Sequence, residues 1–267
     1  LAPPAGHQLA IGTDMLVASR HFPEATPPEA VAHKALAVNL SDLAAMGAAP
    51  LAFTLSLGLS GSDEAWLERF SRGLRAVAER WGCDLIGGDT VRSGQLTLSI
   101  TAFGTLPPGT AIRRSGARAG DRIAVTGTIG DATLGLMLAL GEAEAPSTLA
   151  AGDSAQLMER LNRPEPRLGV GQALRDHVSA GLDISDGLLQ DLGHLLTASA
   201  LAAEIDLDAI PLSPAARRWL EGRPTDIERL LAGGDDYELV VALPPDVPLD
   251  PAWGLTVIGR LTDEWPI

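Results

Sequence analysis

Hydrophobic residues in the N-terminal part of the chain recur with two different periods in successive segments, one typical of strands and one typical of helices. Apolar side chains occupy every second position in Leu51–Leu57 and again in Leu96–Ala102, which predicts two half-buried strands. Between Asp63 and Gly82 the apolar residues recur at helical spacing, which predicts an amphipathic helix with Asp63 as its N-cap and Gly82 at its end. The pattern therefore favours an α/β protein.

Three further segments complete the order β-α-β-α-β-β for this region. Leu9–Val17 and the short Asp84–Ile86 both predict strands. The segment from Pro28 to Gly47 predicts a second helix, because proline is favoured in a first turn and glycine at a helix end.

A proline- and glycine-rich break at 106–109, followed by a basic, glycine-rich stretch up to Asp121, predicts a domain boundary. We place an N-terminal domain at 1–112 and a C-terminal domain at 113–267. The second region again alternates strands and helices, so both domains are expected to be layered α/β (α+β) units. Its predicted elements are strands Arg122–Thr126, Leu182–Ile184, Tyr237–Leu243 and Leu255–Ile258, and helices near 131–140, on either side of 163–166, and after Leu188.

Composition narrows the class of protein. The formal net charge of −14 argues against a nucleic-acid-binding surface. A single cysteine, Cys83, excludes an internal disulfide and suits a reducing cytoplasm, and its position beside an apolar strand favours a core residue. The longest apolar run, Leu134–Leu140, is far shorter than the ~20 residues that span a bilayer, and no signal peptide is recognisable. We therefore expect a cytoplasmic protein with no membrane partner.

Candidate chemistry lies in five short acidic signatures, each where a strand should end or a helix begin. Aspartate binds hard cations through oxygen, and glycine lets a backbone approach a phosphate closely. Such signatures predict a site where metal ions hold a polyphosphate, and nucleotide chemistry is the first hypothesis. They are IGTD (11–14), NLSDLAAMGA (39–48), IGGDT (86–90), DISDG (183–187) and GGDDYEL (233–239).

Each signature also has a plainer interpretation. Asp186 can be an ordinary N-cap, and the glycines at 87 and 88 can form a hairpin turn. Asp42 can lie on an exposed helix face, although its apolar neighbours suggest burial, where an unpaired carboxylate is unfavourable unless a cation is bound. Lys34 lies two helical turns before Asp42, where it can form an ion pair or contact phosphate. Trp81 fits a core position as well as a place beside a nucleotide.

Taken together and in order, five segments of this chain resemble the thiamine-monophosphate kinases, members of the superfamily of aminoimidazole ribonucleotide synthetase and selenophosphate synthetase. The resemblance extends from Leu9 to about Arg260. It implies an N-terminal mixed sheet that forms a barrel in a homodimer, and a C-terminal α/β layered domain. The segments are HKALAVNLSDLAAMGAAP, DLIGGDT, IRRSGARAGDRIAVTG, LDISDGLLQDLGHL and GGDDYEL.

The resemblance implies that ATP and thiamine phosphate react to ADP and thiamine diphosphate by direct in-line transfer, with several Mg²⁺ ions and ATP bound at the dimer interface. No general base is expected, because a phosphate oxygen of the acceptor is already largely ionised at neutral pH. The positions carried over are Thr13, Asp14, Asp42, Asp89, Asp183 and Asp186 as metal ligands, Trp81, Gly88, Asp89, Arg114 and Ser185 at ATP, and His21 and Asp235 at thiamine phosphate.

The chain departs from the family pattern in three ways. A GDDA signature that precedes the first strand is absent, as is a C-terminal aromatic segment; we expect truncation or disorder to explain this, not evolutionary loss. Asp235 stands where the family usually has glutamate. Two alternatives stay open: another ATP-dependent enzyme of the superfamily, such as a selenophosphate synthetase, and a non-catalytic acidic scaffold that binds nucleotide. Formation of thiamine diphosphate from ATP and thiamine phosphate distinguishes the kinase from both alternatives.

Overall fold

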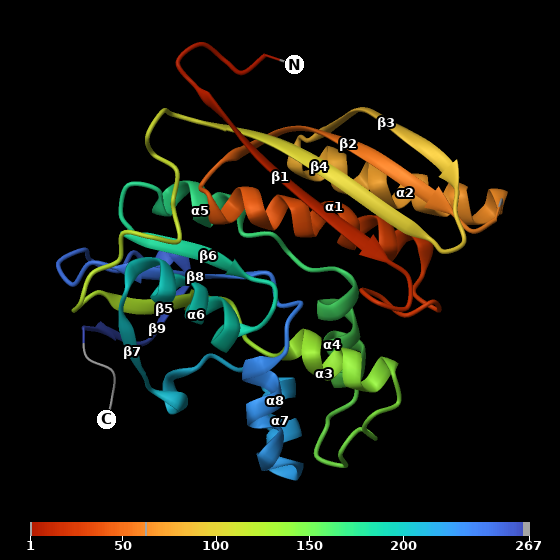
Figure 1. Cartoon of the computed structure of the whole chain (residues 1–267). Coiled ribbons are helices and arrows are strands. Elements are labelled where there is room, and N and C mark those ends of the chain that lie inside the picture. The colour runs from red at the N-terminus through yellow and green to blue at the C-terminus, as the bar shows by residue number, and fades with distance from the viewer. Residues whose placement is uncertain (1, 62, 264–267) are drawn as a thin grey trace.

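The computed structural model describes residues 2–61 and 63–263, which form two β-sheets with helices packed on them (Figure 1). The N-terminal sheet has the strand order β1-β4-β2-β3. Its strands are β1 (Gln8–Val17), β2 (Ala49–Leu59), β3 (Asp84–Arg92) and β4 (Thr97–Leu106). Strand β4 is antiparallel to β1 and β2, whereas β3 is parallel to β2, so the sheet is mixed, as the resemblance implied.

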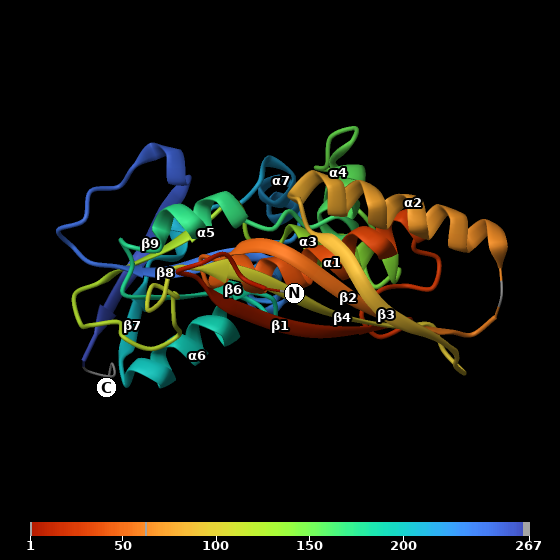
Figure 2. The ribbon, with the colours of Figure 1, turned by 90° about the horizontal axis from the view of Figure 1, so that it is seen from above.

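Two long helices, α1 (Pro28–Ala45) and α2 (Glu64–Trp81), cover one face of this sheet (Figure 2). The predicted ends of α2 are confirmed: Asp63 Oδ1 accepts a hydrogen bond from Trp66 N, at 3.2 Å, and Gly82 adopts a left-handed conformation with φ +60°. Helix α1 is buried along almost its whole length, because α2 covers one side of it and the C-terminal domain another.

The other face of the N-terminal sheet is covered by no element among the described residues. Alternation along β1 turns Ala10, Gly12, Asp14 and Leu16 towards the helices and exposes Ile11, Thr13 and Met15 on the other face. A sheet with an apolar face open to water is unusual in a monomer. The large apolar side chains exposed on β1 and β3 are Leu9, Ile11, Met15, Leu85, Ile86 and Val91.

Strand β3 is longer than the sequence pattern predicted, and this overturns one interpretation. The glycines of IGGDT lie inside β3 and pair with β2, so they form no hairpin turn. Gly88 has φ +150°, and a Cβ built on it would lie 1.8 Å from the carbonyl oxygen of Leu55. The position therefore needs glycine for close packing of two strand backbones.

The C-terminal sheet has the order β6-β8-β5-β9-β7, and all its neighbouring strands are antiparallel. The strands are β5 (Arg122–Thr126), β6 (Ala180–Ile184), β7 (Ala202–Ile205), β8 (Glu238–Leu243) and β9 (Leu255–Thr262). The helices are α3 (Asp131–Ala139), α4 (Asp153–Asn162), α5 (Leu168–Leu174), α6 (Leu188–Ser199), α7 (Pro214–Gly222) and α8 (Ile227–Ala232).

Helix α1 lies between the two sheets and contacts β6 and α5 of the second region (Figure 1). One hydrophobic core extends from the N-terminal sheet through α1 to β8, where it includes Leu239 and Val241. Burial of both sides of α1 therefore fixes the two sheets relative to each other. Among the described helices, none combines the length and the apolar character that a membrane span requires.

Candidate active site

The polar residues of the buried helix α1 hold the segments that carry the predicted carboxylates. Asn39 Oδ1 accepts a 3.0 Å hydrogen bond from the backbone N–H of Asp14 on β1. The hydroxyl of Ser41 donates a 2.7 Å hydrogen bond to Asp183 Oδ2 at the end of β6. Asp42 lies against β1, because a Cβ built on Gly12 would be 2.9 Å from Asp42 Oδ2. Three carboxylates from three elements therefore meet at one end of α1.

Asp42 and Asp183 line a pocket with a volume of about 260 Å³ between the two domains. Its walls combine charge with apolar surface: Asp42, Asp183 and the exposed Arg114 lie beside aliphatic side chains. The lining residues are Ile11, Gly12, Asp42, Ala45, Met46, Ile112, Arg114, Gly181, Leu182 and Asp183.

The electrostatics of the pocket favour a bound cation. Burial, together with the charges of Asp183 and Asp14, raises the pKa of Asp42 to about 7 against the opposing effect of Arg114. Burial also raises the pKa of Asp183 to about 6, although the hydrogen bond from Ser41 lowers it. The pKa of Asp14 is raised by burial and by the charge of Asp186, against the opposing effect of His21. Carboxylates that repel one another in this way are stabilised by a shared divalent ion.

The DISDG turn that follows β6 is held by a residue that the sequence analysis did not single out. Asp191 Oδ2 accepts hydrogen bonds from the backbone N–H groups of Ser185, Asp186 and Gly187, at 2.9, 2.9 and 3.1 Å. The N-cap interpretation of Asp186 is therefore wrong: α6 begins after Gly187, and Asp186 instead accepts a hydrogen bond from Gln190. The QDLGHL segment held the only sequence signal for Asp191, an acidic residue one turn into a helix.

Asp186 is left exposed at the rim, where its carboxylate faces solvent. Oxygen atoms of Asp186 and Asp191 and a ring nitrogen of His194 lie within 4.8 Å of one another. Asp191 already uses Oδ2 for three N–H groups, so this exposed trio is a weaker candidate for a cation than the buried carboxylates on β1, α1 and β6.

The two residues predicted at thiamine phosphate lie on either side of this cluster. His21 is exposed; its Nδ1 accepts a 3.0 Å hydrogen bond from Val17 N, which leaves an Nε2–H free to donate. Asp235 forms an ion pair with Lys34 of α1, at 3.0 Å between Nζ and Oδ1. Of the two roles that the sequence left open for Lys34, the structure shows an ion pair, and its partner lies far away in the sequence.

The remaining acidic residues of GGDDYEL belong to the framework. Glu238 is fully buried and accepts hydrogen bonds from Arg160, Arg167 and Thr126. Asp236 is also buried: its Oδ2 accepts from Gly130 N, its Oδ1 has no partner among the described residues, and burial raises its pKa well above the ordinary range. These two groups order the C-terminal domain and do not reach the pocket.

Thr13, Asp89 and Gly88 lie away from the cluster in a single chain. Thr13 follows the strand alternation onto the uncovered face, where its hydroxyl donates to Ile100 O, so it points away from Asp14. Strand β3 forms the edge of the sheet opposite β1, and there Asp89 only accepts a hydrogen bond from Thr90 N.

Trp81 packs at the end of α2 on the helix-covered side of the sheet. Its ring lies 5.6 Å from that of His33 in an edge-on arrangement and under the guanidinium of Arg80. It lines none of the acidic pocket, so the structure agrees better with the core interpretation than with a nucleotide contact.

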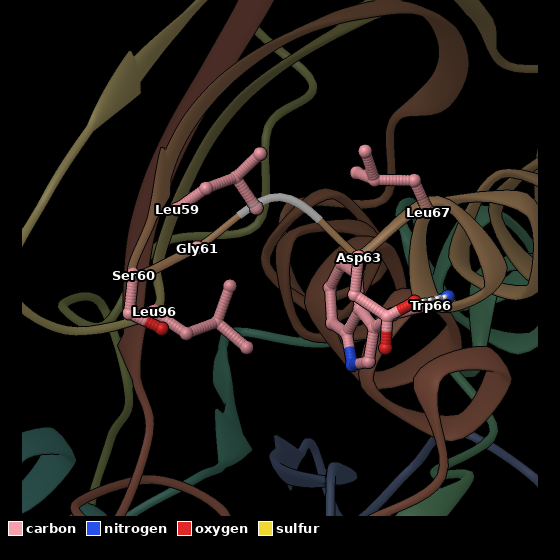
Figure 3. A pocket seen from close by; sticks show the side chains of 7 residues that line it. All are labelled: Leu59, Ser60, Gly61, Asp63, Trp66, Leu67 and Leu96. Atoms are coloured by element: carbon pink, nitrogen blue, oxygen red, sulfur yellow. Dashed lines mark hydrogen bonds between the residues drawn. The ribbon is translucent and has the colours of Figure 1, made fainter.

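A second hollow lies at the other end of the N-terminal sheet, beside Trp66 (Figure 3). Its volume is about 160 Å³, and the indole of Trp66 is stacked on Phe70 behind it, with ring centroids 5.0 Å apart. It shares no lining residue with the acidic pocket and contributes one carboxylate, Asp63, which caps α2. The acidic pocket is therefore the better candidate for phosphate chemistry.

The donor set fits a hard divalent cation. Asp14, Asp42 and Asp183 supply only carboxylate oxygens, which Mg²⁺ prefers, and the nearest described cationic side chain that acts on Asp42 is Arg114. Without a metal ion the three carboxylates resist ionisation, as their raised pKa values indicate. The residues of this pocket are thus suited to one or more Mg²⁺ ions with phosphate oxygens completing the coordination.

Comparison with known proteins supports the family that the sequence resembles. The profile described as "AIR synthase related protein, N-terminal domain" matches residues 1–106, and that of the C-terminal domain matches 118–266. The thiamine-monophosphate kinase of Salmonella typhimurium is 46% identical over 241 residues, which cover 90% of this chain and 73% of that protein.

Solved structures agree. The crystal structure of thiamine-monophosphate kinase from Stenotrophomonas maltophilia K279a has a TM-score of 0.91 and 42% identity, covering 99% of this chain and 85% of that one. A structure named AaThiL complexed with AMPPCP and TMP has a TM-score of 0.89 and 33% identity, covering 98% and 84%. With both domains matched and close relatives covering nearly the whole chain, this protein belongs to the thiamine-monophosphate kinases, within the AIR synthase related family.

Proposed function

We propose that this protein transfers the γ-phosphoryl group of ATP to thiamine phosphate, giving ADP and thiamine diphosphate. The observation that carries the proposal is that Asp42 and Asp183 line one pocket with Arg114, and that the charge of Asp14 acts on both carboxylates, in a chain whose relatives are named thiamine-monophosphate kinases. The relative complexed with AMPPCP, an ATP analogue, and TMP supports both substrates.

The carboxylates of Asp14, Asp42 and Asp183 would hold Mg²⁺, with the exposed Asp186 as a further ligand. Bound Mg²⁺ neutralises charge on the phosphates of two anionic reactants, which is the main requirement of phosphoryl transfer. Arg114 adds a positive charge to the lining of the pocket, where it would contact phosphate oxygens of ATP. Ser185, which precedes Asp186 in the DISDG turn, would contact the nucleotide.

The acceptor needs positioning more than activation. Its phosphate is largely dianionic at neutral pH, since the second phosphate pKa is ~6, so an oxygen can attack without a general base. His21 would donate its Nε2–H to that phosphate, because Nδ1 is engaged by Val17 N. Asp235 would contact the organic part of the acceptor from the C-terminal domain.

A homodimer accounts for Asp89, Gly88 and Thr13. In one chain Asp14 and Gly88 share a row across the sheet, through Ile100 and Leu55, and are three strand spacings or roughly 14 Å apart. If a second copy covers the apolar face and pairs its β3 edge with β1, the sheets close into a barrel. The partner subunit's Asp89 then comes beside β1, close to the carboxylate cluster, and Thr13 points into the barrel.

The domain boundary and the cellular location that the sequence predicted are also part of the proposal. The division at 112/113 is supported by the two sheets lying on either side of it. A cytoplasmic location is supported by the single buried cysteine. The alternatives, a selenophosphate synthetase-like enzyme or a non-catalytic scaffold, lack support from the names of the relatives with high identity.

The decisive experiment supplies the chain with Mg·ATP and thiamine phosphate and measures thiamine diphosphate by chromatography. We expect product that requires Mg²⁺ and is lost in Asp183→Asn, with Asp250→Asn, an exposed aspartate in a 3₁₀ turn far from the pocket, as the control. Bound ATP without any product would favour the scaffold, and selenophosphate formed from selenide would favour the superfamily relative.

A further inference from the structure

The one lysine of this chain is buried at the junction between the two domains. Lys34 lies in the middle of α1 with a side chain that is 2% exposed. Its ammonium forms one ion pair, with Asp235, and its Nζ makes no well-oriented hydrogen bond within the described residues. A buried lysine charge with a single partner contributes little to folding stability or lowers it. Its presence here therefore indicates a role other than stability.

Asp235 is the exposed member of the pair. Its side chain is 26% exposed, and both its described contacts are made by Oδ1, from Lys34 and from the hydroxyl of Tyr237 at 3.2 Å. Oδ2 has no partner among the described residues. The carboxylate is therefore held from behind, with one oxygen left to accept a hydrogen bond from a ligand.

The backbone around Asp235 is held in an unusual conformation. Asp235 and Tyr237 have φ of +70° and +51°, in the left-handed region that non-glycine residues rarely adopt. Asp235 N donates to Ser185 O, and Tyr237 N donates to Ile184 O, so this segment lies directly on the DISDG turn. The position of the Asp235 carboxylate is thereby coupled to the segment that carries Asp183 and Asp186.

Helix α1 connects these elements. Lys34 and Asp42 are eight residues apart on it, about 12 Å along the axis. The same buried helix thus holds Asp235 at one point and the carboxylate cluster two turns further on. A shift of Asp235 relative to α1 would change the distance between Asp235 and the carboxylate cluster, the two places that would hold the two ends of a bound acceptor.

We propose that Lys34 is a positioning residue for the acceptor: it fixes Asp235 Oδ1, so that Oδ2 receives an N–H donor of the organic, cationic part of thiamine phosphate. This inference rests on the proposed function and extends it to a residue that does not itself touch substrate. Lys34 sets the affinity for the acceptor and has no direct part in binding ATP or Mg²⁺.

The single lysine makes a direct test possible. Protein labelled with ¹³Cε,¹⁵Nζ-lysine gives one lysine side-chain NMR signal, that of Lys34. We expect thiamine phosphate alone to shift this signal, a Mg²⁺-bound ATP analogue alone to leave it in place, and Asp235→Asn to move it in the free protein. A wild-type protein that binds thiamine phosphate by calorimetry with an unmoved signal overturns the inference, as does a folded Asp235→Asn with the signal unchanged.

Kinetics give a second, independent measurement. Lys34→Met should raise KM for thiamine phosphate about tenfold, the equivalent of one lost charge-assisted contact, and leave KM for ATP within about twofold. Lys34→Arg, which keeps the charge, should lie between this variant and the wild type. The control is Arg218→Met, which breaks the Arg218–Asp153 ion pair far from the pocket and should leave both KM values unchanged.

Three outcomes are separable. A wild-type chain that neither binds thiamine phosphate nor forms thiamine diphosphate overturns the proposed function, and this inference with it. Equal changes in both KM values in Lys34→Met, with normal wild-type turnover, overturn the inference alone. If Lys34→Met does not fold, the lysine signal of the wild type is the remaining test, and thiamine phosphate that binds without shifting this signal overturns the inference.

Discussion

Ser41 Oγ lies 2.7 Å from Asp183 Oδ2, and this hydrogen bond joins the helix of one domain to the carboxylate of the other. Ser41 is fully buried and Asp183 is 5% exposed, so the contact is shielded from water. It favours the ionised form of Asp183 in a place where burial and neighbouring carboxylates favour the neutral form. The hydroxyl therefore helps to keep Asp183, a proposed metal ligand, charged at neutral pH.

Replacement of Ser41 by alanine should raise the pKa of Asp183 above its present value of about 6, because the hydrogen bond that lowers it is lost. We expect the acidic limb of the pH profile of kcat/KM to move up by about one unit and the apparent affinity for Mg²⁺ to fall about tenfold. Ser213→Ala is the matched control, since it removes another buried serine-to-aspartate hydrogen bond, to Asp131. It should lower stability and leave the profile where it is; a shift in both variants would contradict the assignment.

Asp42 should make the metal-free protein less stable as pH rises. Its pKa is about 7 in the folded chain and near 3.8 in the unfolded chain, so the folded chain holds the proton more tightly between these values. The stabilisation is fully present below pH ~4 and is lost as pH rises through ~7. Asp42→Asn lacks this dependence, and without metal at pH 8 it should be more stable than the wild type by about 4 kcal/mol.

Urea unfolding with EDTA, at pH 5 and pH 8, measures this difference. At pH 8, Mg²⁺ should restore the stability of the wild type. It should have little effect on the stability of Asp42→Asn, because a proposed ligand of the ion has been replaced. Wild type and variant with parallel pH dependence would show that Asp42 does not titrate in this range.

Gly88 should tolerate no side chain, whereas its neighbour Gly87 should. A Cβ at Gly88 would meet the carbonyl oxygen of Leu55 at 1.8 Å and φ there is +150°; a Cβ at Gly87 would have nothing within 4 Å. We expect Gly88→Ala to lower the free energy of unfolding by about 3 kcal/mol or more and Gly87→Ala by less than about 1 kcal/mol. Chemical denaturation at one protein concentration compares them, and equal losses would exclude close packing of β2 on β3 as the reason for this glycine.

A shared active site should allow complementation between subunits. Asp14→Asn and Asp89→Asn are each expected to be nearly inactive as homodimers. In a heterodimer of the two, one site combines an intact Asp14 with the partner subunit's intact Asp89. Coexpressed chains that mix at random should therefore recover about a quarter of the wild-type activity.

Purification by two different affinity tags isolates the heterodimer and sharpens the measurement. Mixed Asp14→Asn and Asp42→Asn chains are the control, because both residues lie in one chain's cluster and no intact site can form. Recovery in the control, or none in the heterodimer of Asp14→Asn and Asp89→Asn, would show that Asp89 does not act across the interface.

The local elements of this protein could be predicted from the sequence. Asp63 and Gly82 mark the ends of α2 because a cap and a left-handed glycine depend on neighbouring backbone groups only. The period-two pattern identified β2 and β4, and the five acidic signatures indicated the metal-assisted class of chemistry. Residue type and spacing were sufficient because each of these features is decided within a few residues along the chain.

Only the tertiary structure decided which of the acidic residues share a site. Asp14 and Asp42 meet because α1 packs on β1, whereas Asp89 lies at the far edge of the same sheet. Asp186 is not a cap, because Asp191 takes the free N–H groups of its turn. Lys34 faces Asp235 because burial of α1 between two sheets brings distant segments together. Such contacts depend on how whole elements exclude water from a common core, which no local pattern specifies.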